Sequence, residues 1–149
     1  MLYRFLIIDN NRIERNLYQA ILFHHFKHST IEFADSYPDA LRKCSSSNYS
    51  VIISDMEMPR MSGTDFFEEL KTRAPLSAKK IIFVSSNIET YKSSFFKEND
   101  CPSIQKPYKK RELLQLIDAI VGGEKKSSAR DRKGTPGSVP ILKAEEAAP

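Results

Sequence analysis

Polar side chains that could do chemistry stand at the ends of four predicted strands. Three of these strands are short apolar runs, and the fourth is the segment Ser103–Gln105. Unbroken apolar runs are typical of strands covered on both faces, as in a parallel sheet. Because the carboxyl ends of parallel strands meet at one edge, we expect a single shared site there. The polar residues at these ends are Asp9 and Asn10, Ser54 and Asp55, Ser85 and Ser86, and Lys106.

A pair of carboxylates, a hydroxyl and a lysine suit phosphoryl chemistry. Asp9 and Asp55 would hold Mg²⁺, a hard cation that prefers oxygen ligands. Asp55 could also be a nucleophile that accepts a phosphoryl group as an acyl phosphate. Ser85 could donate a hydrogen bond to one phosphoryl oxygen, and Lys106 could place its charge beside another. Two carboxylates about 4 Å apart repel by roughly 4 kcal/mol at an effective dielectric constant of about 20. A divalent cation makes their approach favourable.

The elements that must position these residues alternate along the chain. The predicted strands are residues 5–8, 30–34, 51–53, 80–84 and 103–105, and the predicted helices lie near residues 13–24, 38–44, 64–74, 90–97 and 110–121. Alternation of this kind predicts βαβ units. We therefore expect an α/β fold, a doubly wound five-stranded parallel sheet with helices on both faces.

Several helix details follow from the same patterns. Ile13, Leu17 and Ile21 recur at four-residue spacing, as on the apolar face of an amphipathic helix. In each of the pairs Phe66-Phe67 and Phe95-Phe96, one ring is expected in the core and one at the surface. Pro75 is expected to end one helix, and Gly122-Gly123 to end the last.

The domain organisation follows from length and composition. The chain has 149 residues, enough for one domain and a tail. We expect the domain to span residues 1–122. Residues 123–149 are rich in Lys, Arg, Ser, Gly, Pro and Ala, which predicts a disordered tail or linker.

Charge and cysteine content narrow the functional classes. The net charge of +4 is spread along the chain and forms no concentrated basic run, so direct nucleic-acid binding is not expected. No stretch approaches the roughly 20 apolar residues of a membrane span, and the first apolar run is too short for a signal peptide. Cys44 and Cys101 are far apart, which favours reduced thiols and a cytoplasmic location.

Four segments resemble one known family. The stretch VIISDMEMPRMSG, residues 51–63, closely resembles the phosphoacceptor segment of response-regulator receiver domains of two-component signal transduction, the CheY-like superfamily. The stretches LIIDN, FVSS and QKPY resemble the other receiver motifs, in the same order and at fitting intervals. The resemblance covers about residues 3–121 and implies a flavodoxin-like receiver fold.

The resemblance also implies a role for each site residue. Asp55 is then the phosphorylation site, Ser85 the switch hydroxyl and Lys106 the phosphate-contacting lysine. Asp9 and the main-chain carbonyl of Glu57 join Asp55 as ligands of Mg²⁺. The Lys106-Pro107 peptide bond is expected to be cis.

Partners follow from the resemblance as well. The phosphoryl group would come from a phosphohistidine on a histidine kinase or phosphotransfer protein. Phosphorylation would bias the fourth and fifth βα regions between two arrangements, which a downstream protein would bind. We expect a signalling module, monomeric or weakly dimeric, and not an enzyme, although it assists its own phosphorylation and dephosphorylation.

Two positions depart from the family pattern. Asn10 stands where a second acid is usual. Its amide carbonyl can still ligate Mg²⁺ but brings no negative charge, so we expect weaker binding of Mg²⁺, with the Glu57 side chain partly restoring the missing charge. Ser103 stands where many receivers carry an aromatic residue that moves with the switch hydroxyl, so we expect a muted output switch.

Three other functions compete with the phosphoacceptor reading. The first is a pseudo-receiver, a phosphorylation-independent interaction module of the same fold, which Asn10 and Ser103 favour. The second is a small hydrolase in which Asp55 forms a transient phosphoenzyme and Glu57 is the only candidate acid-base group. The third is a DNA-binding regulator whose output part lies outside this sequence.

Overall fold

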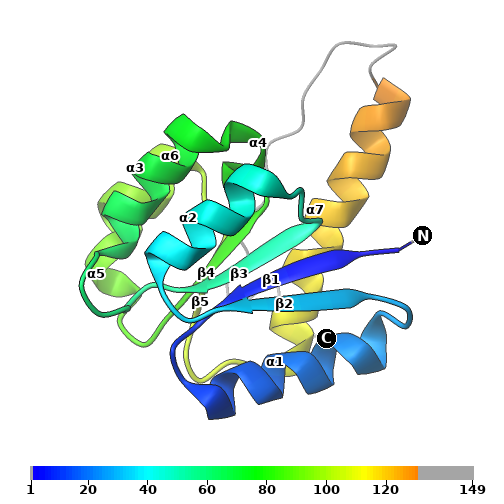
Figure 1. Cartoon of the computed structure of the whole chain (residues 1–149), viewed down its shortest axis with the longest axis horizontal. Coiled ribbons are helices and arrows are strands. Elements are labelled where there is room, and N and C mark those ends of the chain that lie inside the picture. Colours follow the sequence, from blue (N-terminus) through cyan, green and yellow to red (C-terminus); the bar gives the residue numbers. More distant parts are fainter. Residues whose placement is uncertain (1, 131–149) are drawn as a thin grey trace.

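Strands and helices alternate along the chain in the computed structural model, which describes residues 2–130 (Figure 1). The strands are β1 (Arg4–Ile8), β2 (Thr30–Ala34), β3 (Val51–Asp55), β4 (Ile81–Ser85) and β5 (Ser103–Gln105). The helices are α1 (Arg12–His25), α2 (Tyr37–Ser46), α3 (Gly63–Arg73), α4 (Pro75–Ala78), α5 (Glu89–Tyr91), the π-helix η1 (Lys92–Phe96), α6 (Lys97–Asn99) and α7 (Lys110–Arg130).

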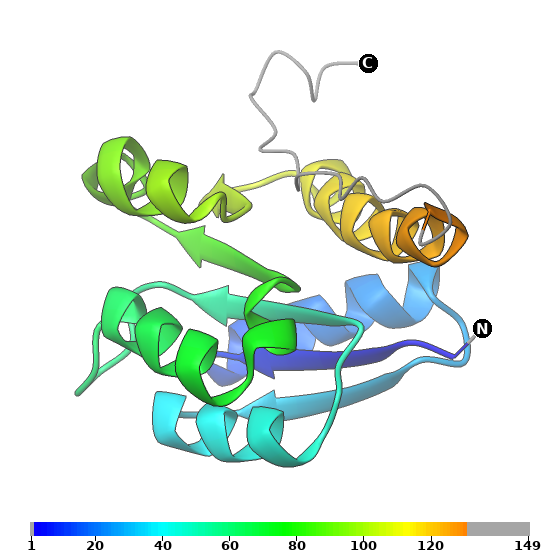
Figure 2. The same cartoon turned by 90° about the horizontal axis from the view of Figure 1, so that it is seen from above.

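All five strands form one parallel sheet in the order β2-β1-β3-β4-β5. Helices α1 and α7 cover one face, whereas α2, α3 and the segment with η1 cover the other (Figures 1 and 2). Each face has its own apolar core, built from alternate residues of the central strands. The expected doubly wound α/β fold is confirmed.

Strand position explains the apolar patterns of the sequence. Strands β3 and β4 are buried at every residue and β1 at all but its first, because each has a strand on both sides and helices on both faces. Edge strand β2 is mostly half-buried, which agrees with its alternating sequence. No helix in the described part of the chain is long and apolar enough to cross a membrane.

The buried face of α1 differs from the expected one. Ile13 and Leu17 are 79% and 49% exposed, whereas Tyr18, Ile21 and Leu22 are buried against the sheet. With 3.6 residues per turn, residues one position further along the sequence than the predicted apolar face also lie together on one side of the helix. The large Tyr18 ring joins the core, and this leaves two aliphatic side chains in solvent.

Both phenylalanine pairs lie wholly in the core, so the expectation of one surface ring in each pair is wrong. Phe67 on α3 contacts Phe83 of β4 and Phe95 of η1 edge-on, and Phe96 packs on the same rings. Phe66 stacks on Tyr37 of α2, with the ring centroids 4.3 Å apart. Adjacent helix positions can both be buried here because the helices pack against the sheet and against each other.

One predicted helix end is confirmed and another is wrong. Helix α3 ends at Arg73, before Pro75, as expected. Pro75 then opens the short helix α4, as its fixed φ and missing N–H allow at a first helical position. Helix α7 does not stop at Gly122-Gly123 but continues to Arg130. Glycine in a helix costs only about 1 kcal/mol relative to alanine, and good helix formers follow the pair. The residues after 130 lie outside the described part of the chain, so the boundary at 122 and the disordered tail stay predictions.

Candidate functional site at the carboxyl edge of the sheet

The four strand ends meet at one edge, as the sequence predicts. Asp9 follows β1, Asp55 ends β3, Ser85 ends β4 and Lys106 follows β5. The Lys106 Nζ atom lies 3.5 Å from Asp55 Oδ2, and the Lys106 main-chain N–H donates to the Ser85 carbonyl at 2.8 Å. The Lys106-Pro107 peptide bond is cis, as expected.

The Asp55 carboxylate is held on both of its oxygens. Oδ1 accepts a hydrogen bond from the Glu57 main-chain N–H at 2.9 Å, and Oδ2 faces Lys106. Only 9% of the residue is exposed. Burial raises its pKa to about 6, and the negative charge of Asp9 adds to this, while the Glu57 N–H and Lys106 pull the pKa down. A second positive charge at this position would favour the ionised carboxylate.

Asp9 is fully buried and keeps one oxygen free. Oδ1 accepts from the Asn11 main-chain N–H at 2.8 Å, whereas Oδ2 has no hydrogen-bond partner among the described residues. Burial raises its pKa as well. Asp9 does not cap α1, because Asn11 takes that role with hydrogen bonds from the N–H groups of Ile13 and Glu14. A buried carboxylate oxygen without a partner is costly unless a ligand compensates it.

These residues fit a hard divalent cation such as Mg²⁺. A cation would provide a partner for Oδ2 of Asp9, which has none among the described residues, and its positive charge would lower the raised pKa of Asp55. Asn10 is exposed. Within the described part of the chain, no group of three or more His, Cys, Asp or Glu side chains is arranged to hold a metal ion. The cation would therefore depend on two carboxylates and on neutral oxygens.

The Ser85 hydroxyl is already engaged. Its Oγ donates to Glu57 Oε1 at 2.5 Å and accepts from the Asn87 main-chain N–H at 2.9 Å. Ser85 is fully buried, whereas Glu57 is exposed. The Glu57 carboxylate therefore contacts the Ser85 hydroxyl, a contact that the sequence does not predict.

Tyr37, at the start of α2, is a site residue that the motifs do not include. Its hydroxyl donates to the Asp55 main-chain carbonyl, which also accepts from Ser54 Oγ at 2.9 Å. Burial raises the Tyr37 pKa, so the phenol keeps its proton. The partner of Tyr37 is a backbone atom, which the sequence does not reveal. The only sequence signal for its role is a tyrosine three residues after a predicted strand.

Ser103 is buried in β5, where its place in the sheet lies opposite Phe83 of β4. The aromatic side chains near this part of the fold come instead from the segment after β4. Tyr91 packs edge-on against Phe96, with the ring centroids 5.9 Å apart. These aromatic side chains thus lie on α5 and η1, whereas the aromatic residue of the family pattern would lie on β5, at the position of Ser103.

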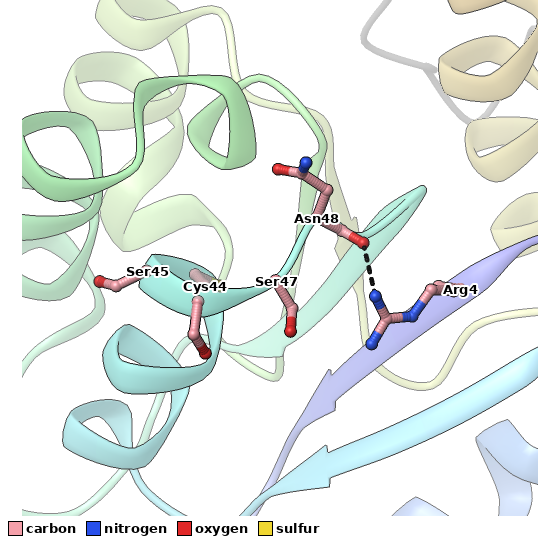
Figure 3. A pocket seen from close by; sticks show the side chains of 6 residues that line it. Arg4, Cys44, Ser45, Ser47 and Asn48 are labelled. Carbon is pink, nitrogen blue, oxygen red and sulfur yellow. Dashed lines mark hydrogen bonds between the residues drawn. The ribbon is translucent and has the colours of Figure 1, made fainter.

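In the described part of the chain, cavities lie at the two opposite edges of the sheet. One of about 410 Å³ is lined by Arg4 and residues 44–48, at the amino ends of the strands and away from Asp55 (Figure 3). The Arg4 guanidinium donates a hydrogen bond to the Asn48 carbonyl at 3.5 Å, drawn as a dashed line in Figure 3. The other, of about 350 Å³, lies at the carboxyl edge and is lined by Lys106 together with Glu14, Leu17, Ser86, Pro107 and Tyr108.

The fold and this edge place the chain in the class of CheY-like, flavodoxin-like receiver domains. CheY4 of Vibrio cholerae matches with a TM-score of 0.69 at 21% identity, over 80% of this chain and 99% of that one. Response regulator TrrA of Thermotoga maritima, in complex with Mg²⁺-BeF, matches with a TM-score of 0.69 at 25% identity, over 79% and 98%. The receiver domain of sensor histidine kinase PA1611 of Pseudomonas aeruginosa, with a coordinated magnesium ion, matches with a TM-score of 0.70 at 17% identity, over 82% and 99%.

The chain belongs to the response regulator receiver domain family of two-component signalling, which matches residues 5–118. Sensory transduction protein RegX3 of Mycobacterium leprae is 29% identical over 96 residues, 63% of this chain and 48% of that protein. Sensory transduction protein LytR of Staphylococcus epidermidis is 26% identical over 133 residues, 88% of this chain and 51% of that protein. The chain thus spans about half the length of these relatives.

Proposed function

We propose that this receiver accepts a phosphoryl group on Asp55 from a histidine kinase or phosphotransfer protein, and that phosphorylation changes which partner it binds. The observation that carries the proposal is the buried Asp55 carboxylate, with Lys106 on one side and the unpartnered Oδ2 of Asp9 nearby in the sheet. The proposal is for a signalling module and not for an enzyme with a substrate of its own.

Each residue has a distinct part in the proposed transfer. An Asp55 oxygen attacks phosphorus, and the histidine nitrogen of the donor leaves with the bonding electron pair. Lys106 lies next to Asp55 and can neutralise a phosphoryl oxygen, while Ser85 can donate a hydrogen bond to another. Asp9, Asp55 and the Glu57 carbonyl would hold Mg²⁺, which supplies further positive charge to the transferring group. Asn10 brings no charge, so the proposed Mg²⁺ affinity is weak.

A surface suited to a phosphodonor lies beside this edge. Ile13 and Leu17 expose aliphatic side chains on α1, and Leu17 also lines the 350 Å³ cavity that Lys106 shares. A helix of a phosphohistidine-bearing domain could bury these side chains while it presents its imidazole to Asp55. Burial of about 100 Å² of apolar surface would contribute roughly 2.5 kcal/mol.

The output is proposed to involve the fourth and fifth βα regions, in a monomer or weak dimer in the cytoplasm. Tyr91 and Tyr108 are half-buried in these regions and could meet a protein partner. Phe95 is buried, so it is not available for such contact. The chain spans only about half of RegX3 and LytR. What those relatives do as whole proteins, including any contact with nucleic acid, is therefore not transferred to this chain.

Acetyl phosphate with Mg²⁺ tests the proposal directly. We expect a mass increase of one phosphoryl group that hydroxylamine removes and that Asp55→Ala abolishes. Asp39→Ala is a matched control, because Asp39 lies on α2 in ion pairs with Arg42 and Lys43. A folded wild-type protein without any adduct would contradict the proposal. A rapid, repeated turnover of acetyl phosphate would favour the hydrolase reading.

A pseudo-receiver is the second candidate, and Ser103 is the observation that favours it. Serine at this position is too small to fill the space that an aromatic ring fills when it turns inward with the switch hydroxyl. We expect amide resonances near Asp55, Ser85 and Lys106 to shift when Mg²⁺ and beryllofluoride are added, with little change at Ser103. Large concerted shifts at Ser103 would contradict the muted switch, and no shifts anywhere would favour the pseudo-receiver.

A further inference from the structure

The hydrogen bond between Ser85 and Glu57 conflicts with the proposed use of Ser85. A serine hydroxyl has a single proton to donate. In the structure that proton goes to Glu57 Oε1 over 2.5 Å, and the Ser85 oxygen accepts from the Asn87 N–H. A phosphoryl group on Asp55 can receive a hydrogen bond from Ser85 only after Glu57 has released it.

Glu57 contacts the two functional positions with different groups. Its main-chain N–H donates to Asp55 Oδ1 at 2.9 Å, and its carboxylate accepts from Ser85. We propose that Glu57 is a positioning residue that holds the Ser85 hydroxyl in the unphosphorylated protein and competes with the phosphoryl group for it. This inference rests on the proposed function and concerns the regulation of the same site.

Charge and exposure make this competition reversible. A phosphoryl group and the Glu57 carboxylate are both negative, so phosphorylation of Asp55 disfavours the carboxylate at its present position. Glu57 is exposed, so its side chain can turn into water without leaving a buried charge behind. Ser85 is fully buried and has no such alternative. The hydroxyl is thus held until a stronger acceptor arrives.

Beryllofluoride binding at saturating Mg²⁺ tests the inference by a double-mutant cycle. We expect Glu57→Ala to tighten beryllofluoride binding about fivefold, the factor that corresponds to loss of one competing hydrogen bond. In the Ser85→Ala background the same substitution should give no gain, because the contested proton is absent. The affinity can be measured by calorimetry and by the ¹⁹F resonances of the bound anion. Without metal, Glu57→Ala should also shift the amide resonances of Ser85 and Asn87.

Glu69→Ala is the matched control, since Glu69 is a surface glutamate of α3 paired with Arg73. It should leave beryllofluoride binding unchanged. An equal gain from Glu57→Ala with and without Ser85 would show a general charge effect and would overturn the inference. So would a wild-type protein that binds beryllofluoride as tightly as Glu57→Ala. If neither protein binds it or takes a phosphoryl group, the proposed function fails and this inference fails with it.

Discussion

The Tyr37 hydroxyl donates a hydrogen bond to the main-chain carbonyl of Asp55, with 2.5 Å between the two oxygens. The phenol ring stacks on Phe66 of α3, so one side chain joins α2, α3 and the end of β3. The pairing of β1 with β3 ends at Ser54, one residue before Asp55, whereas Asp55 still pairs with Val84 of β4. Tyr37 therefore stabilises the backbone at the proposed phosphoacceptor.

Tyr37→Phe should destabilise the protein by about 1 kcal/mol, because one buried hydrogen bond is lost while the stacking remains. It should also slow the formation of the acetyl phosphate adduct on Asp55, since the backbone there is held less firmly. Urea denaturation and mass spectrometry measure the two effects. Tyr49→Phe is the control: its hydroxyl contacts Glu32 at 3.2 Å, far from Asp55 in the sheet, so only stability should respond. Equal adduct rates for Tyr37→Phe and wild type would contradict the positioning role.

Asp55→Asn should make the metal-free protein more stable at neutral pH. Burial raises the Asp55 pKa from 3.8 to about 6, so the folded state binds its proton more tightly than the unfolded state. The stability that this provides is present below the unfolded pKa and is lost as pH rises towards and past 6. The wild-type protein should therefore lose on the order of 3 kcal/mol between about pH 4 and 7 relative to the variant.

The check is urea denaturation of both proteins with a chelator present. Added Mg²⁺ should narrow the gap at neutral pH, because a cation favours the ionised carboxylate. A difference in the free energy of unfolding that stays constant from acid to neutral pH would contradict the assignment.

Asn10→Asp should tighten Mg²⁺ binding about tenfold, because a further carboxylate near Asp9 adds charge attraction to the cation. The gain should shrink at high salt, since Asn10 is exposed. Asn11→Asp is a matched control: it adds the same charge at the next position while keeping a side chain suited to cap α1. Calorimetric titration compares the three proteins. Equal affinity for wild type and Asn10→Asp would contradict the weakened-site hypothesis.

The parts of the site that sequence reasoning found are those that end a predicted strand. Asp9, Asp55, Ser85 and Lys106 could be placed together because apolar runs define strands and parallel strands end at one edge. The hydrogen bonds of Tyr37 could not be found this way, since a backbone carbonyl leaves no trace in the sequence. The same is true of the Glu57 side chain, whose direction depends on the loop after β3.

The errors in the fold come from patterns that permit two solutions. In α1, the Ile13 stripe and the Tyr18 stripe both satisfy helical periodicity, and only packing against the sheet selects Tyr18. In α7, Gly122-Gly123 resembles a helix stop, but glycine weakens a helix without breaking it. Local signals of this kind predict where elements occur better than where they end.

Glycine-to-alanine substitutions should have opposite effects in two places. A Cβ atom at Gly122 or Gly123 would meet nothing within 4 Å, so Gly122→Ala and Gly123→Ala should each stabilise α7 by up to about 1 kcal/mol and raise helix content. At Gly63 a Cβ atom would lie 2.5 Å from Met56 Sδ, beside Asp55. Gly63→Ala should therefore destabilise the protein by about 1 to 3 kcal/mol.

Circular dichroism and urea denaturation measure both effects. Gly63→Ala controls for a general benefit of alanine, which would stabilise all three variants alike. If Gly122→Ala and Gly123→Ala change neither helix content nor stability, the last helix ends where the glycine pair suggests, and its continuation to Arg130 is wrong. A gain at both positions requires that the helical backbone pass through them, because alanine stabilises a helix only where its φ and ψ are helical.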